Sequence, residues 1–575
     1  MRLFQRILLS KGIWIFCLRG HDVCAVNSLR IAFIFAMEFL RKWIEYEKID
    51  PSAQPEVRTL RRGRLGFWHL YFQSVSMISP AGAMAATMTS SAGYAWGALP
   101  FSYILAIIAG TLLMNTTVWY SMKVASSGGY YAYVFAAVGP RWGVICGMMF
   151  ILSYFNVVTN GILFVGGVFF PGFIQTMTGA TYADKAWIGI MFAFIILIYI
   201  LAFLGIRASL DYSLVIGTFE LLFMFACTLA VVIKVGSQNT GQVFHPSLAP
   251  TRADIAIAAL LSLFSISGYS AVAFLGEEAK NPRKQIPIAV ILAYSSVALL
   301  FFFMSYGLTV GWGYKNMSEF SASLDPGVIV YKRYLTPVIG WFMVILILNA
   351  MFLGSLAPLN SCARLIFAFA REGLIFPKIF ATVDKKQNPI VSTAVVAFLA
   401  AVVSLIAGLA MGTYDGFVML VTTSSLSLYV GHIIANLTLG IFYYRQKQLN
   451  WFFHVIVPII ASILVGFSIF FTMYPYDPVT LACPIWTGAW LILSIIGAYL
   501  TPRDRLDAAQ HRFERVQDIM GATYVKIQGS TAWNKNGPEM TVEEETFQSS
   551  DTFQQNHHHS IDKYVDDELI ASSHA

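Results

Sequence analysis

The sequence predicts an all-α polytopic membrane protein with twelve transmembrane helices, and three observations support this fold class. Hydrophobic residues make up 57% of the 575 residues and charged residues only 12%, against roughly 25% charged in a soluble domain. The mean hydropathy is +0.64. Apolar runs of about 20 residues, the length that crosses a bilayer, recur between residues 70 and 500. A soluble globule of this size is excluded, because it would lack surface charge.

The chain before the first span has a mixed composition. Within residues 1–67, apolar clusters such as IAFIFAMEFL are interrupted by charged residues, among them Arg30 and Glu45, and none reaches a full span. We expect a cytoplasmic N-terminal arm, interfacial or disordered, that ends in the basic run TLRRGRLGF. Met37 is an alternative start of translation.

Gly, Pro and charged residues separate the apolar runs and set the boundaries of the predicted spans. The first five spans are residues 72–96, 98–122, 143–170, 187–206 and 213–236. The next five are residues 255–276, 286–312, 336–370, 390–412 and 416–444. The last two are residues 452–474 and 479–500.

The chain after the last span is polar. Residues 501–575 hold 13 acidic and 7 basic residues, a composition typical of a disordered cytoplasmic tail. A short amphipathic helix is expected around RLDAAQHRFERVQDIM. The adjacent His557, His558 and His559 are interpreted as solvated rather than as a metal site.

Charge predicts the orientation in the membrane. Residues 1–500 carry 31 basic and 18 acidic residues. Sixteen of the bases in short loops fall on the side of the two termini and six on the opposite side, so the positive-inside rule puts both termini in the cytoplasm. A cationic body fits a cell membrane with anionic lipid on its inner face, and no nucleic-acid partner is needed.

Several function classes lack their motifs. The chain has no GxxxxGK[ST] phosphate loop, no HExxH metal helix and no CxxC pair, so an ATP-driven pump and a zinc protease are disfavoured. No nucleophile, base and orienting residue occur together in a motif. We therefore expect neither an enzyme nor a bound cofactor or metal.

Two spans contain helix-breaking residues at matched positions. The first span carries SVSMISPAGAMAATM, with Pro80 and Gly82, and the sixth carries LFSISGYSAVAFLGEE, with Gly268 among serines. A broken helix is tolerated in a membrane only where it is buried in protein or lines a cavity. Breaks in the first and sixth of ten spans are typical of an inverted five-plus-five repeat with a site at the midplane. The alternative is that these residues only kink or pack the helices.

The ends of broken helices suit a zwitterion. Free amides at a helix N-terminus attract a carboxylate, and free carbonyls at a C-terminus attract an ammonium group. We expect the carboxylate at Ser79–Ala83 and the ammonium at the carbonyls of Phe264, Ser265 and Ser267.

Three stretches resemble one known family. FSISGYSAVAFLGEEAKNPRKQIPIA, LNSCARLIFAFAREGLIFPKIFATVDKKQNPIVSTA and SSGGYYAYVFAAVGPRWGVICG are similar, in order and spacing, to signatures of the amino acid, polyamine and organocation (APC) transporters. The resemblance implies a leucine-transporter-type fold with helices 1 and 6 broken. Its parts would be a first inverted repeat over 68–237, a second over 252–445, and helices 11 and 12 over 452–500. It also implies alternating-access transport of amino acids or related amines.

The resemblance carries over some site residues. Counting back from Gly268, Phe264 falls where the family places an aromatic lid over the substrate. The family shows a Gly-Ser/Thr-Gly cluster in helix 1, whereas this chain has SPAGA, so the binding positions transfer as a window. The expected substrate-binding residues are Ser79, Ala81, Gly82, Ala83, Phe264, Ser265, Ser267 and Gly268.

Charged residues in or beside spans are further candidates, because burial in lipid is costly. Glu220, in the fifth span, is interpreted as the carrier of a coupling proton. Proton-coupled relatives often place a Lys near this position, and the alternative is a structural pair with Arg364 or another base. Glu277 and Glu278 are expected to form an inner gate with nearby bases such as Arg371, each pair contributing about 1 kcal/mol under solvent screening. Anchoring at the membrane interface is the alternative for both.

The remaining polar groups expected near the site are neutral, which favours a neutral substrate. They are Asn156, Thr159, Asn160, Asn360, Ser361 and Thr422–Ser425. His432 in the tenth span is interpreted as a packing residue, with a proton carrier as the alternative. The sequence therefore predicts a secondary active, proton-coupled transporter of neutral amino acids. The alternatives are an amino acid exchanger, a sodium-coupled carrier, and a membrane sensor that binds amino acid without moving it.

Overall fold

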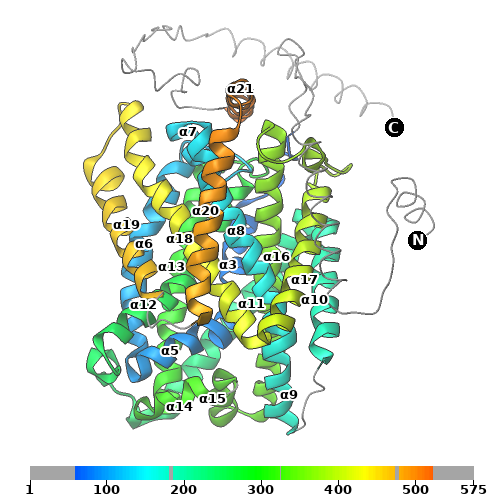
Figure 1. Ribbon diagram of the computed structural model, residues 1–575. Helices are drawn as coiled ribbons and strands as arrows, with labels where there is room; N and C mark the ends of the chain where they lie inside the picture. The colour runs from blue at the N-terminus through cyan, green and yellow to red at the C-terminus, as the bar shows by residue number, and fades with distance from the viewer. Residues whose placement is uncertain (1–58, 180–184, 324, 473–477, 522–575) are drawn as a thin grey trace, which may run out of the picture. The chain divides into compact units, whose positions relative to one another are not determined.

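The computed structural model describes residues 59–179, 185–323, 325–472 and 478–521. All regular elements in these ranges are helices, and most run between the two ends of one bundle (Figure 1). We call these ends the α21 end, where α7 and α21 lie, and the α14 end, where α14 and α15 lie. Most of the N-terminal arm, the tail beyond residue 521 and His557–His559 fall outside the described residues.

The long helices agree closely with the predicted spans. In the first half of the chain the described helices are α3 (Phe67–Ile78), α4 (Pro80–Ala83), η1 (Met84–Met88), α5 (Thr89–Ala95), η2 (Trp96–Ala98), α6 (Leu99–Ser121), α7 (Tyr130–Val138), α8 (Pro140–Phe164), η3 (Val165–Phe169), α9 (Phe170–Thr178), α10 (Ala186–Leu204), α11 (Ile206–Val235), η4 (Gly236–Gln238), η5 (Gln242–Phe244) and η6 (Pro246–Leu248).

The second half of the chain repeats this agreement. Its described helices are α12 (Arg252–Ile266), η7 (Ser267–Leu275), α13 (Pro282–Trp312), η8 (Tyr314–Asn316), α14 (Met317–Ala322), α15 (Pro326–Tyr334), α16 (Pro337–Glu372), η9 (Lys378–Ala381), α17 (Ile390–Met411), α18 (Thr413–Arg445), η10 (Phe452–Ile456), α19 (Val457–Thr472), α20 (Pro478–Leu500) and α21 (Arg503–Ile519). The expected amphipathic helix after the last span is thus present as α21.

Eleven stretches among the described residues are long and apolar enough to cross a membrane. The first of them, Phe67–Ser121, is 55 residues long and holds both of the first two predicted spans, from α3 to α6. This finding supports the polytopic fold class. The count of twelve and the inverted repeat remain predictions.

The first predicted span is broken, and the residue at the break is Ser79. It ends α3 with φ 55° and ψ 69°, in the left-handed region, and Pro80 then begins α4. Proline suits the first position of a helix, where no intrahelical N–H bond is lost. Gly82 lies within α4 and does not itself unwind the chain, contrary to what the sequence suggests. Its missing side chain instead leaves room for α16, because a Cβ at position 82 would lie 2.9 Å from Met351 Cε.

The sixth predicted span changes its winding where Gly268 predicts a break. The α-helix α12 ends at Ile266, and the tighter 3₁₀ helix η7 continues from Ser267 to Leu275. A Cβ at position 268 would lie 2.7 Å from the backbone nitrogen of Ile78 and 2.8 Å from the carbonyl carbon of Met77. We call the first span, interrupted at Ser79, and the sixth span, whose α-helix ends at Ile266, the two broken spans. Glycine at position 268 lets them approach each other closely.

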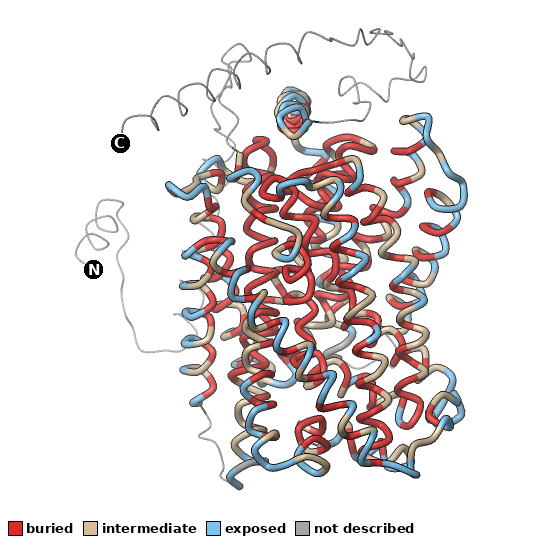
Figure 2. The backbone as a smooth tube through the Cα atoms, turned by 180° about the vertical axis from the view of Figure 1, so that it is seen from behind, coloured by how far each residue is buried: buried red, intermediate tan, exposed pale blue. Residues whose placement is uncertain are grey.

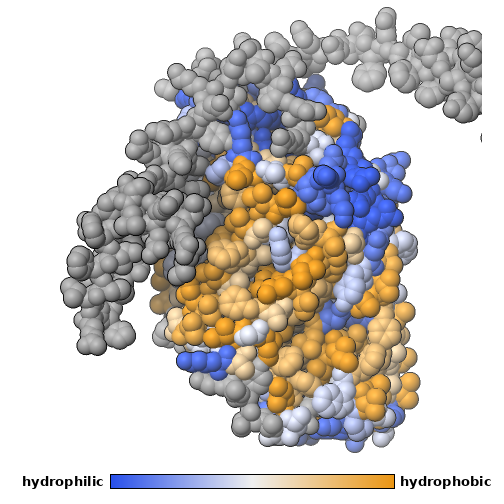
Figure 3. All heavy atoms as spheres, turned by 90° about the vertical axis from the view of Figure 1, so that its right-hand side faces the viewer, coloured by the Kyte–Doolittle hydropathy of each residue, from blue (hydrophilic) through white to orange (hydrophobic). Residues whose placement is uncertain are grey.

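Burial separates central from peripheral helices. Within the apolar core of each span, 72% of the residues are buried in α12–η7 and 67% in α16, against 28% in α10 and 22% in the α20 stretch. Figure 2 shows the buried residues at the centre of the bundle and exposed ones along its outer helices. In Figure 3 hydrophobic side chains cover the middle of one face, and hydrophilic ones gather toward the α21 end. Exposed apolar helices of this kind face lipid.

Candidate substrate-binding site

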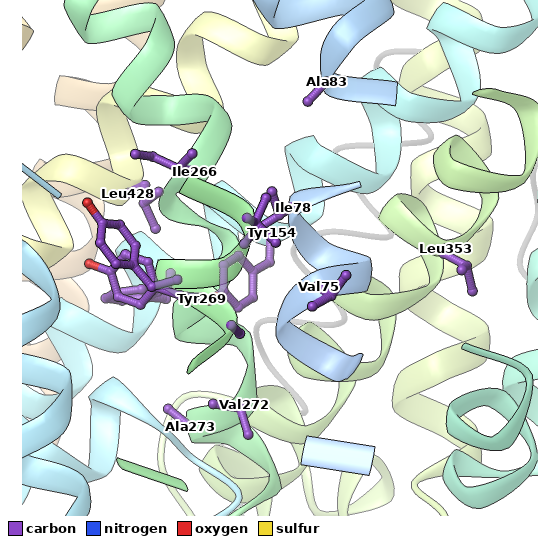
Figure 4. Close-up of a cluster of buried hydrophobic side chains, with 14 of the residues drawn as sticks. Val75, Ile78, Ala83, Tyr154, Ile266, Tyr269, Val272, Ala273, Leu353 and Leu428 are labelled. Atoms are coloured by element: carbon purple, nitrogen blue, oxygen red, sulfur yellow. The ribbon is translucent and has the colours of Figure 1, made fainter. Parts of the chain in front are cut away.

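A cavity of about 100 Å³ lies where the two broken spans meet. Ser79, Gly82 and Ala83 line it from the first span, and Phe264, Ser267 and Gly268 line it from the sixth. Figure 4 shows Ile78 and Ala83 on the two sides of the first break, with Tyr154 close to Ile78. The remaining wall comes from α8, α16 and α18.

The two broken spans are also joined by a hydrogen bond. Ser74 Oγ donates to the carbonyl of Tyr269 at 2.9 Å, on the α21 side of the breaks. Ser79 Oγ donates to the carbonyl of Ala350 at 2.6 Å, which ties the break in the first span to α16. Buried polar groups are costly without partners, so these bonds help to hold the interrupted backbone in place.

Seven of the eight expected substrate-binding residues line the cavity. They are Ser79, Gly82, Ala83, Phe264, Ser265, Ser267 and Gly268. Ala81 is not among them, and its N–H donates to Glu220 Oε1 at 2.8 Å. The alternative in which Glu220 pairs with Arg364 is wrong, since Arg364 bonds to Glu278 instead.

Several amides in the expected carboxylate-binding window already have acceptors. The N–H of Ser79 donates to the Val75 carbonyl at 2.9 Å, and the N–H of Ala83 donates to the Ser79 carbonyl at 2.7 Å. With Ala81 bonded to Glu220 and no N–H on Pro80, the window offers fewer free donors than the sequence suggests. The sequence gives no local signal for the bond between Ala81 and Glu220, because the two residues are 139 positions apart in the chain.

Apolar side chains dominate the cavity wall. Among the described residues, none that lines it is acidic, basic or a histidine. The sequence pointed correctly to Asn160 but missed Ser153 and Ser355, which also line it. The other neutral candidates lie outside the lining, and Asn360 and Ser361, for example, bond to Ser209 and to the Ala271 carbonyl. His432 packs against the rings of Tyr130 and Phe150, as a packing residue would.

Two buried ion pairs cross the bundle on the α21 side of the cavity. Arg364 Nε and Nη2 donate to both oxygens of Glu278, at 2.6 and 3.1 Å. Arg371 Nη1 donates to both oxygens of Glu277, each at 2.9 Å. Both arginines are on α16, so the pairs connect the end of the sixth predicted span to the eighth.

The pair of Glu277 belongs to a larger network. Its Oε1 accepts the Ser127 N–H at 3.0 Å and the Ser127 hydroxyl at 2.8 Å. Arg371 Nη2 also donates to Glu372 Oε1 at 3.1 Å, and the Tyr131 hydroxyl bonds to the other oxygen of Glu372. Burial alone would raise the pKa of the Glu277 carboxyl, but the Arg371 guanidinium and the Ser127 donors hold that pKa below its ordinary value.

Burial changes the expected energetics of these pairs. The side chains of Arg364 and Glu278 are each 2% exposed, and those of Arg371 and Glu277 are 3% and 0% exposed. The expectation of solvent screening and about 1 kcal/mol per pair is therefore wrong. Breaking a buried pair leaves an unpaired charge and destabilises a protein by about 3–5 kcal/mol.

The segment before the first span and helix α21 cover this network. The amides of Arg64 and Leu65 donate to the Glu278 carbonyl, each at 2.9 Å. Arg512 Nη1, on α21, donates to the Glu372 carbonyl at 2.8 Å, and the ring of Phe513 stacks on that of Phe135 at 4.2 Å. These contacts fasten the α21 end of the bundle.

A family model described as amino acid permease matches residues 65–499. The chain belongs to the amino acid permease family. This membership confirms the resemblance that the three sequence stretches carry, and with the apolar helices it makes the permease a multi-pass membrane protein. Permeases are transporters rather than a class of enzymes.

Curated relatives of this permease share about a quarter of its sequence. It is 25% identical over 449 residues to the methylthioribose transporter of Bacillus subtilis (strain 168), covering 76% of this chain and 93% of the relative. It is 24% identical over 411 residues to the branched-chain amino acid permease BcaP of the same organism, covering 69% and 84%. It is 23% identical over 377 residues to cationic amino acid transporter 4 of Mus musculus, covering 62% and 58%.

The names of these relatives refer to different substrates. One is a methylthioribose transporter, one a branched-chain amino acid permease and one a cationic amino acid transporter. Membership of the family therefore indicates transport of amino acids or related small molecules. The side chain that this permease accepts has to be inferred from its own cavity.

Proposed function

We propose that this permease is a secondary active transporter that takes up neutral amino acids with protons by alternating access. The observation that carries the proposal is the cavity between the two broken spans, whose described lining includes no Asp, Glu, Lys, Arg or His. We place the protein in the cell membrane with the α21 end and both termini in the cytoplasm, in line with the excess of basic residues in the loops at that end.

The backbone at the breaks is suited to the charged groups that all amino acids share. The start of α4 carries the positive end of a helix dipole, which the Glu220 carboxylate already contacts at Ala81, and the end of α12 carries the negative end. The substrate carboxylate would lie near Ser79 and Gly82, and the ammonium near the carbonyls of Phe264, Ser265 and Ser267. All five residues line the cavity.

The rest of the cavity argues for an uncharged side chain. A charged group moved into an apolar site without a partner loses its hydration, at a cost of several kcal/mol or more. The wall around the breaks is formed by residues such as Met351, Phe417 and Leu428. A cationic or anionic side chain would therefore bind far more weakly than a neutral one.

Alternating access requires a gate on each side of the site. We assign the gate on the α21 side to the pairs Glu278–Arg364 and Glu277–Arg371, a role that their burial supports. We assign Phe264, on the cavity wall, the role of the lid on the substrate. Release of substrate into the cytoplasm would require the end of η7 to separate from α16, and both ion pairs to break.

Glu220 is our candidate for coupling to protons. Its carboxylate accepts the N–H of Ala81, just after the break in the first span. An ionised carboxylate accepts a stronger hydrogen bond from an N–H than a neutral carboxyl group does. Protonation would therefore weaken the hold of α11 on α4 and couple the proton to movement of the first span.

Uptake by purified permease in liposomes tests this function. We expect neutral amino acids to accumulate when the outside is acidic, and not when only a sodium gradient is imposed. Accumulation that requires sodium would mean that sodium, and not the proton, is the coupling ion. Uptake that occurs only with an amino acid inside the liposomes would indicate an exchanger. Substrate binding without any flux would favour the sensor, whose output would depend on the tail after residue 521.

A further inference from the structure

Two polar groups in the cavity wall have no hydrogen-bond partner. Asn160 Nδ2 and Ser355 Oγ are both buried and make no hydrogen bond within the described chain. Asn160 is 8% exposed and Ser355 is 1% exposed, and both residues line the cavity. They come from different helices, α8 and α16.

Ser355 lies against α8 at the residue that follows Asn160 in the chain. A Cβ at position 161, next to Asn160 in the chain, would collide with Ser355 Oγ. Glycine at this position therefore lets the serine hydroxyl lie directly against the α8 backbone. Both residues belong to the same wall, which otherwise presents apolar groups such as Val157 and Phe164.

Most polar groups around this cavity have protein partners. Ser265 and Ser267 donate to carbonyls of their own helix, and Ser153 pairs with Ser424. Buried donors and acceptors are nearly always satisfied in folded proteins, and one left unpaired is destabilising. An amide and a hydroxyl that lack hydrogen-bond partners in one ligand cavity are therefore suited to bind a polar group of the ligand.

We propose that Asn160 and Ser355 form a subsite that hydrogen-bonds a polar, uncharged group on the substrate side chain. The permease would then select neutral amino acids that carry a side-chain hydroxyl or amide over hydrocarbon analogues of similar shape. This inference rests on the proposed function and adds a side-chain class to it. A hydrocarbon side chain in the same place would leave both polar groups unpaired, which is how such sites reject it.

Threonine and valine provide a direct test, because they differ mainly by a hydroxyl in place of a methyl group. Purified permease in liposomes would take up radiolabelled threonine or valine, each in competition with the other. We expect threonine to be preferred on the order of tenfold to a hundredfold, the range that follows from leaving one buried polar group unpaired. Asparagine against leucine is a second pair of the same kind.

Two substitutions remove the polar groups with little change of shape. In Ser355→Ala and Asn160→Leu we expect the ratio of threonine to valine uptake to fall toward unity. Ser404→Ala is the matched control, because that buried hydroxyl donates to the Thr159 carbonyl and lies outside the cavity lining. Its preference should equal that of the unmodified protein. Valine uptake and thermal unfolding of each variant show that it is folded.

The outcomes separate the two proposals. Equal uptake of threonine and valine by the unmodified permease would overturn the subsite, with neutral amino acid transport left standing. A preference for threonine that survives both substitutions would overturn it as well. Failure of every neutral amino acid to bind or to be taken up would overturn the proposed function itself.

Discussion

The Glu220 carboxylate accepts the N–H of Ala81 at 2.8 Å, two residues after the left-handed Ser79 that interrupts the first span. A carboxylate is thus bonded to the first turn of α4, where aligned N–H groups attract negative charge. This contact joins α11 to the break in the first span. Any change in the charge of Glu220 acts directly on the break beside the cavity.

Glu220→Gln should separate proton coupling from substrate binding. The amide oxygen can still accept the Ala81 N–H, but the side chain no longer binds or releases a proton. We expect accumulation driven by a pH gradient to fall to background, while exchange of internal for external substrate continues. Glu319→Gln, at an exposed acid of α14, is the control and should accumulate substrate normally. Normal gradient-driven accumulation in Glu220→Gln would contradict the proposed role.

The buried gate pairs predict a large loss of stability on single substitution. Arg364→Ala leaves Glu278 charged and buried, so we expect the free energy of unfolding to fall by about 3–5 kcal/mol. The exposed pair Arg207–Asp211, at 3.8 Å, is the control, and Arg207→Ala should change stability by less than about 1 kcal/mol. Thermal unfolding in detergent measures both.

Reversal of the same pair tests its role as a gate. We expect the double variant Glu278→Arg with Arg364→Glu to recover part of the transport that each single variant loses. Equal loss of stability in the buried and the exposed pair, or no recovery in any reversed pair, would speak against the gate.

Gly268→Ala tests the close approach of the two broken spans. The added methyl group would lie 2.7 Å from the backbone nitrogen of Ile78, and backbone cannot move aside as a flexible side chain can. Overpacking of this kind destabilises a protein by about 1–3 kcal/mol, and here we expect it to abolish uptake. Gly189→Ala, on α10 with open space around the added atom, is the control. That variant should be neutral or slightly stabilising. Uptake by Gly268→Ala at the normal rate would show that the contact is dispensable.

Local signals explain how much of this architecture could be predicted. Runs of apolar residues bounded by Gly, Pro and charge locate the spans within a few residues, because a bilayer demands one helical length. Pro80 and Gly268 mark both breaks, since each is a strong local determinant of backbone geometry. The left-handed residue is nevertheless Ser79. Such a conformation is uncommon for serine and is held here by the bond of its side chain to α16.

Pairings across the fold could not be predicted in the same way. The sequence indicates that Glu277 and Glu278 need basic partners. It does not show that Glu277 pairs with Arg371 and Glu278 with Arg364. It also gives no sign that both pairs are buried, which decides their energetics. Ser355 illustrates the same limit, because only the folded chain shows that its hydroxyl lies against Gly161 and has no partner.

Asp325 predicts a pH dependence at the α14 end. Burial raises the pKa of its carboxyl from 3.8 to about 7, and Oδ2 has no hydrogen-bond partner in the described chain. The folded state therefore holds its proton at a higher pH than the unfolded state. Stability from this group is fully present below about pH 4 and is lost as the pH rises toward 7.

Asp325→Asn removes this dependence and keeps the shape of the side chain. Asparagine also tolerates the left-handed backbone at this position, where φ is 50°. At pH 8 we expect the variant to be more stable than the unmodified protein by up to about 4 kcal/mol, at about 1.4 kcal/mol for each pKa unit, and at pH 4 equally stable. Unfolding temperatures measured across this range check the expectation, and a difference that does not vary with pH would refute it.

Helix α21 is expected to restrain the two segments that hold the gate pairs, the end of α16 and the loop at Ser127. Arg512 Nη1 donates to the Glu372 carbonyl, and Gln517 Nε2 donates to the Ala125 carbonyl at 3.0 Å, two residues before the Ser127 that bonds to Glu277. Arg512→Ala should therefore loosen both the end of α16 and the loop at Ser127. We expect faster amide hydrogen exchange in these two segments, because their backbone opens more often. Arg515→Ala, on the exposed side of the same helix, removes an equal charge and should leave exchange unchanged. Equal rates of amide hydrogen exchange in the two variants would mean that α21 contacts these segments without restraining them.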